Sequence, residues 1–554
     1  MTNRAARSPR APHTPSSAAD GVLAGLTAHP LGQTSASVYE TGRVTTLAPW
    51  LPGLDGRVGF LLDAQHPDGT WGAPGGYAIV PTLSATEALL TVLSRHRSRS
   101  LPDAAGLDAG RLAAAAARGL SALRGLGDRN DPARLPDTVA AELIAPALVA
   151  LVNAHLDRLA HDPVTGLDAW GPGARLVPPP GADPETLARV RARLEAGGDI
   201  PPKLWHSLEI VGDPAEAAGS VRPTAGAVCC SPAATAAWLG PRPDTGRLAS
   251  SVAYLNAAAA PHGGAVPSVL PITDFERIWA VGTLVGAGVD VRVPPSLLAD
   301  LEERLAAGAI AGAPGLPPDA DTTSAGLALL SRLGRSHSPD RLWAFELDDH
   351  FCCWQGERTP SPTANAHVLE ALTEHLRRAP ADAARHRAAM DAAMDAAVDA
   401  AIDKVASWLA GAQHGDGSWT DKWHASPYYA TSHCTLALDG VTGDRAGDAV
   451  RRAIEWTLAT QHSDGSWGMW GGTAEETAYA VHILLRTRPG RADARARRAA
   501  ARGGRFLRGR DTGRHPALWQ DKDLYAPTAI CEATRLAALH LVEEHTAADE
   551  ETRP

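Results

Sequence analysis

The chain has few of the features expected of a nucleic-acid-binding, disulfide-bonded or membrane-spanning protein. Its 554 residues carry a net charge of -10 without a long basic block, which argues against a nucleic-acid partner. The six cysteines include the adjacent pairs Cys229/Cys230 and Cys352/Cys353 and form no C-x-x-C motif. We therefore expect neither a disulfide framework nor a zinc or redox motif, and we predict a reducing, cytoplasmic location. The longest apolar run, residues 140–154, is shorter than the ~20 residues that cross a bilayer, so no transmembrane span is predicted.

Phenylalanine and tyrosine are also scarce. Five Phe and seven Tyr accompany fifteen Trp, so tryptophan supplies most of the aromatic side chains. The first twenty residues are rich in Arg, Pro and Ser and contain no apolar segment of the kind a secretory signal needs. We predict a disordered tail over residues 1–20, and the length of the remaining chain favours more than one domain.

A seven-residue peptide occurs three times, as QHPDGTW at 65–71, QHGDGSW at 413–419 and QHSDGSW at 461–467. The last two copies are 48 residues apart, which accommodates a helix, a turn and a second helix. Between the copies, apolar residues recur every three or four positions and strand signals are scarce. The sequence therefore predicts an all-α fold of stacked helical hairpins.

The repeated Q-x-x-D-G-[ST]-W peptide resembles the QW motif of triterpene cyclases and class II diterpene cyclases, where it ties helix ends together and takes no part in catalysis. Further similar segments cover nearly all of the chain after residue 20. The resemblance implies two α/α-barrel domains of the class II terpene cyclase type. The expected β domain comprises residues 21–50 and 265–554, and the expected γ domain, residues 51–264, is inserted into it.

The segment PPDADTT at 317–323 contains the candidate acid. Asp319 is a suitable N-cap for a following amphipathic helix, which places Asp321 in the first turn, where free N–H groups stabilise a carboxylate. Taken alone, two aspartates at a helix start are more often capping residues. The segment also resembles the DxDD signature of class II cyclases, and this implies that Asp321 is the general acid. Thr322 and Thr323 replace the last two positions, and we expect the Thr322 hydroxyl to donate a hydrogen bond to the ionised acid.

The D-x-D-T-T variant resembles that of bacterial drimenyl diphosphate synthases. It implies a sesquiterpene cyclase that protonates farnesyl diphosphate, closes a decalin and keeps the diphosphate. Residues 345–372 are similar to the segment that follows the acid in bacterial labdane-type cyclases, where an Asn or His hydrogen-bonds the acid. We assign that role to Asn365, with helix capping as the alternative.

Carboxylates and lysines mark a candidate diphosphate site. Glu209 and Asp213 would share one face if their segment were helical, and could bind one cation, although such a pair is more often solvated. The segment resembles the EDxxD-like motif of plant copalyl diphosphate synthases, which implies that these two residues bind Mg²⁺ at the substrate's diphosphate. Only four lysines occur, and Lys203, Lys422 and Lys522 lie in motif-like stretches. A compact ammonium group suits a phosphate oxygen, although chance surface positions remain open.

Three other functions remain open at this point. The same chemistry on geranylgeranyl diphosphate would give a copalyl-type product. A protein prenyltransferase would use a related helical barrel with zinc bound by Asp, Cys and His. A helical-repeat interaction module would need no acid. The sequence does not indicate the oligomeric state.

Overall fold

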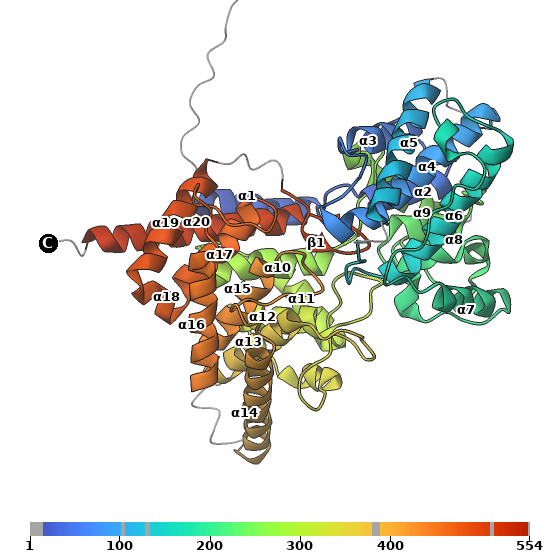
Figure 1. The fold of residues 1–554 in the computed structure, drawn as a ribbon. Helices are drawn as coiled ribbons and strands as arrows, with labels where there is room; N and C mark the ends of the chain where they lie inside the picture. The colour runs from blue at the N-terminus through green and yellow to red at the C-terminus, as the bar shows by residue number, and fades with distance from the viewer. Residues whose placement is uncertain are drawn as a thin grey trace, which may run out of the picture.

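The computed structural model describes residues 15–100, 106–127, 133–246, 248–378, 388–509 and 515–551. Two helical lobes lie side by side, with a short β-hairpin between them (Figure 1). The all-α fold predicted from the sequence is confirmed, since the described residues are mostly helical and their one β-sheet has only two short strands. Of the predicted disordered tail, residues 1–14 lie outside the described residues. The prediction is wrong for residues 15–20, because they are helical: α1 begins at Pro15.

The C-terminal lobe is a double ring of helices. Its inner ring is closed, because each of α10, α12, α13, α15, α17 and α20 packs on the next and α20 returns to α10. The outer helices α11, α14, α16 and α19 cover this ring, and α1 packs on α10 and α20. The elements are α1 (Pro15–Ala28), α10 (Thr273–Gly286), α11 (Pro295–Ala307), α12 (Ala320–Arg332), η7 (Pro339–Phe345), α13 (Pro362–Arg378), α14 (Ala388–Gly411), α15 (Pro427–Asp439), α16 (Asp444–Ala459), α17 (Ala474–Arg486), α18 (Arg488–Ala492), α19 (Ala494–Arg508), β1 (Trp519–Gln520), β2 (Leu524–Tyr525) and α20 (Thr528–Glu551).

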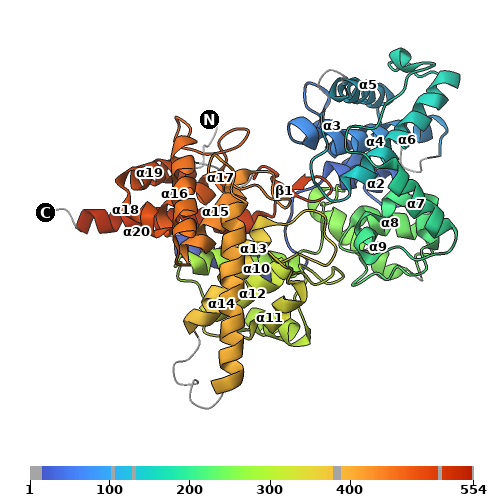
Figure 2. The same cartoon turned by 60° about the horizontal axis from the view of Figure 1, so that its bottom comes forward.

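The inserted lobe is a second, smaller ring, in which α2, α4, α6, the 3₁₀ segment η4 and α8 pack in sequence and α8 returns to α2. Its elements are α2 (Val38–Leu47), α3 (Leu54–Asp63), η1 (Gly75–Ala78), α4 (Ile79–Arg97), α5 (Ala109–Leu126), α6 (Ala141–His161), η3 (Asp168–Trp170), α7 (Pro184–Glu195), η4 (Pro202–Val211), η5 (Asp213–Ala217), α8 (Pro232–Leu239), α9 (Ala249–Ala259) and η6 (Ala260–His262). The lobes remain separate when the molecule is turned (Figure 2).

The chain enters the inserted lobe earlier than the sequence suggested. α1 contributes Ala19, Leu23 and Leu26 to the core of the C-terminal lobe, whereas α2 contributes Tyr39 and Val44 to the cores of the inserted lobe. The crossing therefore falls between α1 and α2 and not near residue 50. The predicted boundary was late because α2 carries no local signal that tells one barrel from the other.

The three repeated peptides make the same contacts. Trp71, Trp419 and Trp467 are buried, and the indole N–H of each donates to the carbonyl of the residue ten positions earlier, at 2.7, 2.9 and 2.7 Å. The glutamine that begins each copy donates to a carbonyl within its own turn and to one on the next outer helix. The motif therefore ties successive helices together at their ends, and carries no reactive group into a cavity.

Two helices are long and apolar enough to cross a membrane by composition, Gly75–Arg97 and Ala141–His161. The first is almost entirely buried inside the inserted lobe and the second is about half buried, so both pack as core helices of the ring.

Candidate active site

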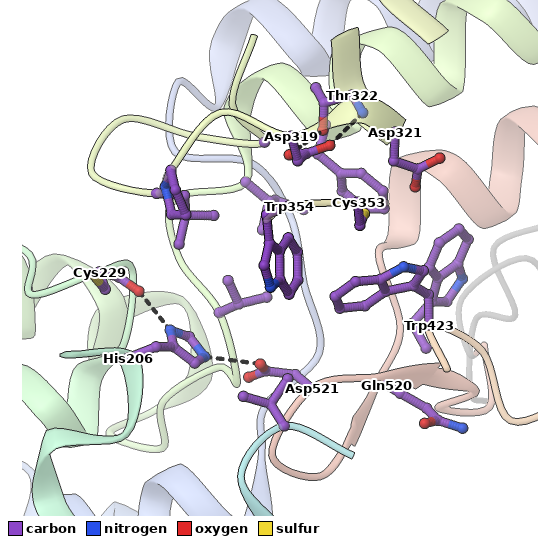
Figure 3. Close-up of a pocket in the computed structure, with 18 of the residues that line it drawn as sticks. His206, Cys229, Asp319, Asp321, Thr322, Cys353, Trp354, Trp423, Gln520 and Asp521 are labelled. Carbon is purple, nitrogen blue, oxygen red and sulfur yellow. Dashed lines mark hydrogen bonds and ion pairs between the residues drawn. The ribbon is translucent and has the colours of Figure 1, made fainter. Parts of the chain in front are cut away.

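The main cavity lies between the two lobes and has a volume of about 260 Å³. The acid motif stands at one end and the pair His206 and Asp521 at the other, with the indoles of Trp354 and Trp423 between them (Figure 3). The wall is mostly apolar. Its aromatic members are Phe275, Trp354, Trp423, Tyr429, Trp519 and Tyr525.

The acid motif forms the start of α12 as predicted. Asp319 is the N-cap, and its carboxylate accepts hydrogen bonds from the Thr322 N–H at 2.6 Å and the Thr322 hydroxyl at 3.0 Å. Asp321 follows in the first turn, largely buried, with its carboxyl group at the cavity wall. Burial, together with the negative charge of Asp321, raises the pKa of Asp319 to about 7.

Neither threonine hydroxyl hydrogen-bonds the Asp321 carboxylate, which corrects the prediction for Thr322. Its hydroxyl donates to Asp319, because the capping geometry aims the side chain back at the N-cap. The hydroxyl of Thr323 donates to the backbone carbonyl of Asp319 at 2.6 Å and accepts from the N–H of Ile310 at 2.9 Å. Both threonines therefore fix the start of the helix.

The partner of the acid is His367 and not Asn365. His367 Nδ1 lies 2.6 Å from Asp321 Oδ1. Asn365 lies two residues earlier on α13, about 200° away around the helix axis, so only one of the two can face Asp321. The Asn365 side chain instead bonds the backbone of Phe351 and Ser361, holding the loop before α13. The alternation in NAH at 365–367 was the missed signal, because it leaves two polar candidates on different faces.

The predicted lysines have different roles. Lys203 is exposed and lines the cavity, as a diphosphate ligand would. Lys422 donates to Glu357 and to the Thr359 carbonyl, both at 2.6 Å, and its ammonium lies 5.3 Å from the rings of Trp354 and Trp423. It therefore orders two aromatic side chains of the wall and is already paired.

His206 lies at the Lys203 end of the cavity and pairs with Asp521. Its Nδ1 lies 2.6 Å from the Cys229 carbonyl oxygen, which can only accept, and its Nε2 lies 2.8 Å from Asp521 Oδ1. Burial alone would lower the pKa of His206, but the Asp521 carboxylate raises it. Both ring nitrogens therefore face acceptor oxygens, an arrangement that favours the protonated ring. The sequence showed no reason to select it, because Asp521 is 315 residues away.

Glu209 and Asp213 do not form the predicted pair. Their segment is two 3₁₀ pieces separated at Gly212, which has a φ of 76°, so the two carboxylates do not share a helical face. Glu209 is buried and accepts from Tyr39 at 2.6 Å and from Lys522 at 2.9 Å, whereas Asp213 is exposed. Lys522 is itself fully buried, so it is unavailable to substrate.

The hairpin turn that carries Lys522 joins the lobes. Lys522 also donates to Glu40 at 2.5 Å and to Ser231 at 2.7 Å, and the neighbouring Asp523 accepts from the Ser37 hydroxyl at 2.8 Å. All of these partners come from the inserted lobe or its connection to α1. One face of the hairpin lines the cavity while its turn is held in the inserted lobe, so lobe docking and cavity shape are coupled.

Comparisons with known proteins agree with this geometry. The ent-copalyl diphosphate synthase of Streptomyces sp. (strain KO-3988) is 43% identical to the chain over 541 residues, covering 97% of this chain and 98% of that protein. The chain belongs to the class II terpene cyclases. The squalene-hopene cyclase C-terminal domain family matches residues 371–527. The solved ent-copalyl diphosphate synthase from Streptomyces platensis superposes with a TM-score of 0.87 at 45% identity, over 96% of this chain and 99% of that one.

The relatives overturn the prediction of a farnesyl diphosphate cyclase that makes drimenyl diphosphate. Proteins 40–43% identical to this class II cyclase are named copalyl diphosphate or labda-7,13-dienyl diphosphate synthases, the latter from Streptomyces clavuligerus at 41% identity over 97% of this chain and 94% of that protein. The drimenyl prediction depended on Thr322 and Thr323. Since both hydroxyls bond within the start of α12, they hold the acid helix and do not measure substrate length.

Proposed function

We propose that this cyclase converts geranylgeranyl diphosphate to a copalyl-type diphosphate, with Asp321 as the general acid. The observation that carries the proposal is the position of Asp321, which stands at the wall of an apolar, aromatic-lined cavity with His367 bonded to one carboxyl oxygen. A hydrogen bond from His367 to Oδ1 leaves Oδ2 to hold the reactive proton. The names of the relatives at 40–43% identity support a twenty-carbon substrate.

The reaction needs a strong acid and a dry cavity. Asp321 gives its proton to the terminal alkene, a C–H bond forms, and the tertiary carbocation is attacked in turn by the next two double bonds to close a decalin. Loss of a proton from the bicyclic cation gives a neutral alkene, and no bond to the diphosphate breaks. The π faces of Trp354, Trp423 and Trp519 suit a developing cation and keep water away from it.

The opposite end of the cavity suits an anion. Lys203 supplies an exposed ammonium group there, whereas the His206 ring already bonds Cys229 and Asp521, and charge-assisted hydrogen bonds to phosphate oxygens are among the stronger polar contacts in proteins. We assign the diphosphate to this end, so that the hydrocarbon tail extends past the aromatic wall to Asp321.

Magnesium does not fit the residues predicted to bind it. The Lys522 ammonium group already bonds Glu209, and Asp213 is exposed on the far side of the Gly212 kink. Among the described residues, no group of three or more His, Cys, Asp or Glu side chains is placed to hold a metal ion. A Mg²⁺ requirement therefore stays a prediction for which the described residues offer no site, and no step of the proposed mechanism depends on it.

The proposal is tested by incubating the enzyme with equal amounts of geranylgeranyl and farnesyl diphosphate, then identifying the dephosphorylated products by mass spectrometry. Bicyclic twenty-carbon alcohol should dominate. A pool dominated by fifteen-carbon drimane alcohol would refute the substrate assignment. Asp321→Asn should lower turnover at least ~10²-fold, since an amide has no acidic proton to give, and parental turnover would refute the acid.

A further inference from the structure

The outer helix α14 carries a stripe of aspartates. Asp395, Asp399 and Asp403 recur at every fourth residue, which places them along one face of the helix, and all three are exposed, with exposed alanines between them. The neighbouring Lys404 is bonded to Glu346, and no cation that the structure describes forms an ion pair with the three aspartates. Like charges four residues apart destabilise a helix, so this stripe has a cost that a cationic partner would offset.

A second outer helix, α19, carries a stripe of the opposite charge. Arg498 and Arg505 lie on one face of it together with Arg495 and Arg502, within about 80° around the helix axis, and none of the four is buried. Arg495 bonds α16 and Arg502 bonds the third repeated peptide. Arg498 and Arg505 form no ion pair with the anions that the structure describes. The stripe therefore presents at least two guanidinium groups that are free to bind an anionic surface.

The two stripes lie on the outside of the C-terminal lobe and cannot neutralise each other within one copy of the chain. α16 packs between α14 and α19, and no ion pair joins the stripes among the side chains described. α14 also extends past the rest of the lobe, where it is open to a neighbour (Figure 1 and Figure 2). The stripes have similar lengths, roughly 12 Å from Asp395 to Asp403 and roughly 15 Å from Arg495 to Arg505. Each stripe is therefore matched by the other in charge and in size.

We propose that this surface joins two copies of the chain, with the aspartate stripe of α14 in one copy lying against the arginine stripe of α19 in the other. A twofold axis makes the contact twice, because each copy supplies one stripe of each charge. Arginine suits such an interface, since its guanidinium group is weakly hydrated and bonds carboxylates through two N–H groups. The net charge of -10 disfavours an anionic membrane or a nucleic acid as the partner, because either would repel the rest of the protein.

Salt gives the first test, because a contact between charged stripes is screened. Sedimentation velocity of the full chain should show a dimer at low ionic strength and a monomer in about 1 M sodium chloride, where the screening length is only about 3 Å. An interface held by apolar contacts would respond in the opposite way, since high salt does not weaken the burial of apolar surface. A parent that is monomeric at low ionic strength overturns the proposal.

Reversing the charge of one stripe at a time gives the decisive test. One variant carries Asp395→Lys with Asp399→Lys, and the other carries Arg498→Glu with Arg505→Glu. In each variant alone, stripes of like charge meet, and the dissociation constant of the dimer should rise at least ~10-fold. In an equimolar mixture, the reversed stripe of one variant meets the reversed stripe of the other and the two native stripes meet, so mixed dimers should form with the parental affinity.

Arg189→Glu with Arg193→Glu is the matched control, because both arginines are exposed on α7 of the inserted lobe and the change in charge is the same. This pair should leave the dimer unchanged. Two variants that merely misfold would not recover on mixing, so a mixture that stays monomeric overturns the proposal, as does a control that dissociates. The parent should also fail to sediment with vesicles of equal phosphatidylglycerol and phosphatidylcholine. Vesicle binding that is lost only in the α19 variant would assign the arginine stripe to a membrane instead.

Discussion

Replacing Lys522 by methionine is the sharpest test of how the two lobes are held together. The ammonium group is fully buried and lies between Glu40 and Glu209, whose side chains are also buried. Burial holds the pKa of Glu40 at about 7 even with Lys522 beside it. Lys522→Met removes the cation and leaves the Glu40 and Glu209 carboxylates without their ion-pair partner.

Removing one partner from a buried ion pair typically costs about 3–5 kcal/mol, because the remaining charge is neither solvated nor paired. We expect Lys522→Met to lower the free energy of unfolding by that amount, measured by urea denaturation followed by tryptophan fluorescence. The loss should be smaller at pH 5 than at pH 8, because Glu40, whose pKa burial raises to about 7, takes up a proton at the lower pH and the folded protein then binds more protons than the unfolded chain.

Lys404→Met is the matched control, since Lys404 pairs with Glu346 in a partly exposed position. Such surface pairs contribute under about 1 kcal/mol. Adding Glu40→Gln and Glu209→Gln to Lys522→Met should recover part of the stability by removing the stranded charges. If Lys522→Met costs no more than the Lys404 control, the buried network does not hold the lobes together.

Three further predictions concern the acid motif, the repeated peptide and the diphosphate end of the cavity. Asp319→Asn keeps the cap of α12 but cannot titrate. Because the pKa of Asp319 is raised from 3.8 to about 7, the parent should lose stability as the pH rises across that window. In thermal unfolding at several pH values, the variant should lose less stability over the same range. Trp419→Phe leaves the buried Leu409 carbonyl without its 2.9 Å donor, so it should cost about 1–3 kcal/mol of stability while the folded fraction keeps its turnover per molecule. Lys203→Gln removes the exposed cation from the diphosphate end and should weaken inhibition by inorganic diphosphate at least ~10-fold in titrations, whereas unchanged inhibition would place the diphosphate elsewhere.

Local patterns in the sequence predicted much of the fold. The three- and four-residue spacing of apolar side chains specifies helices, and the repeated Q-H-x-D-G-[ST]-W peptide specifies how their ends are tied. The start of α12 was predicted for the same reason, since an N-cap aspartate and the acid two residues later act within one helical turn. These features depend on residues close together in the chain.

The partners of the charged side chains were decided only by the tertiary structure. His367 lies 46 residues from Asp321, and Lys522 lies 313 residues from Glu209, so neither pairing has a local signature. The resemblance to labdane-type cyclases placed Asn365 near the acid, but it did not give the rotation of α13 that turns His367 toward Asp321 instead. The kink at Gly212 likewise separates two carboxylates that sequence spacing had paired. Closure of the two helical rings fixes these pairings, because it brings together segments that are far apart in the sequence and carry no local signal for one another.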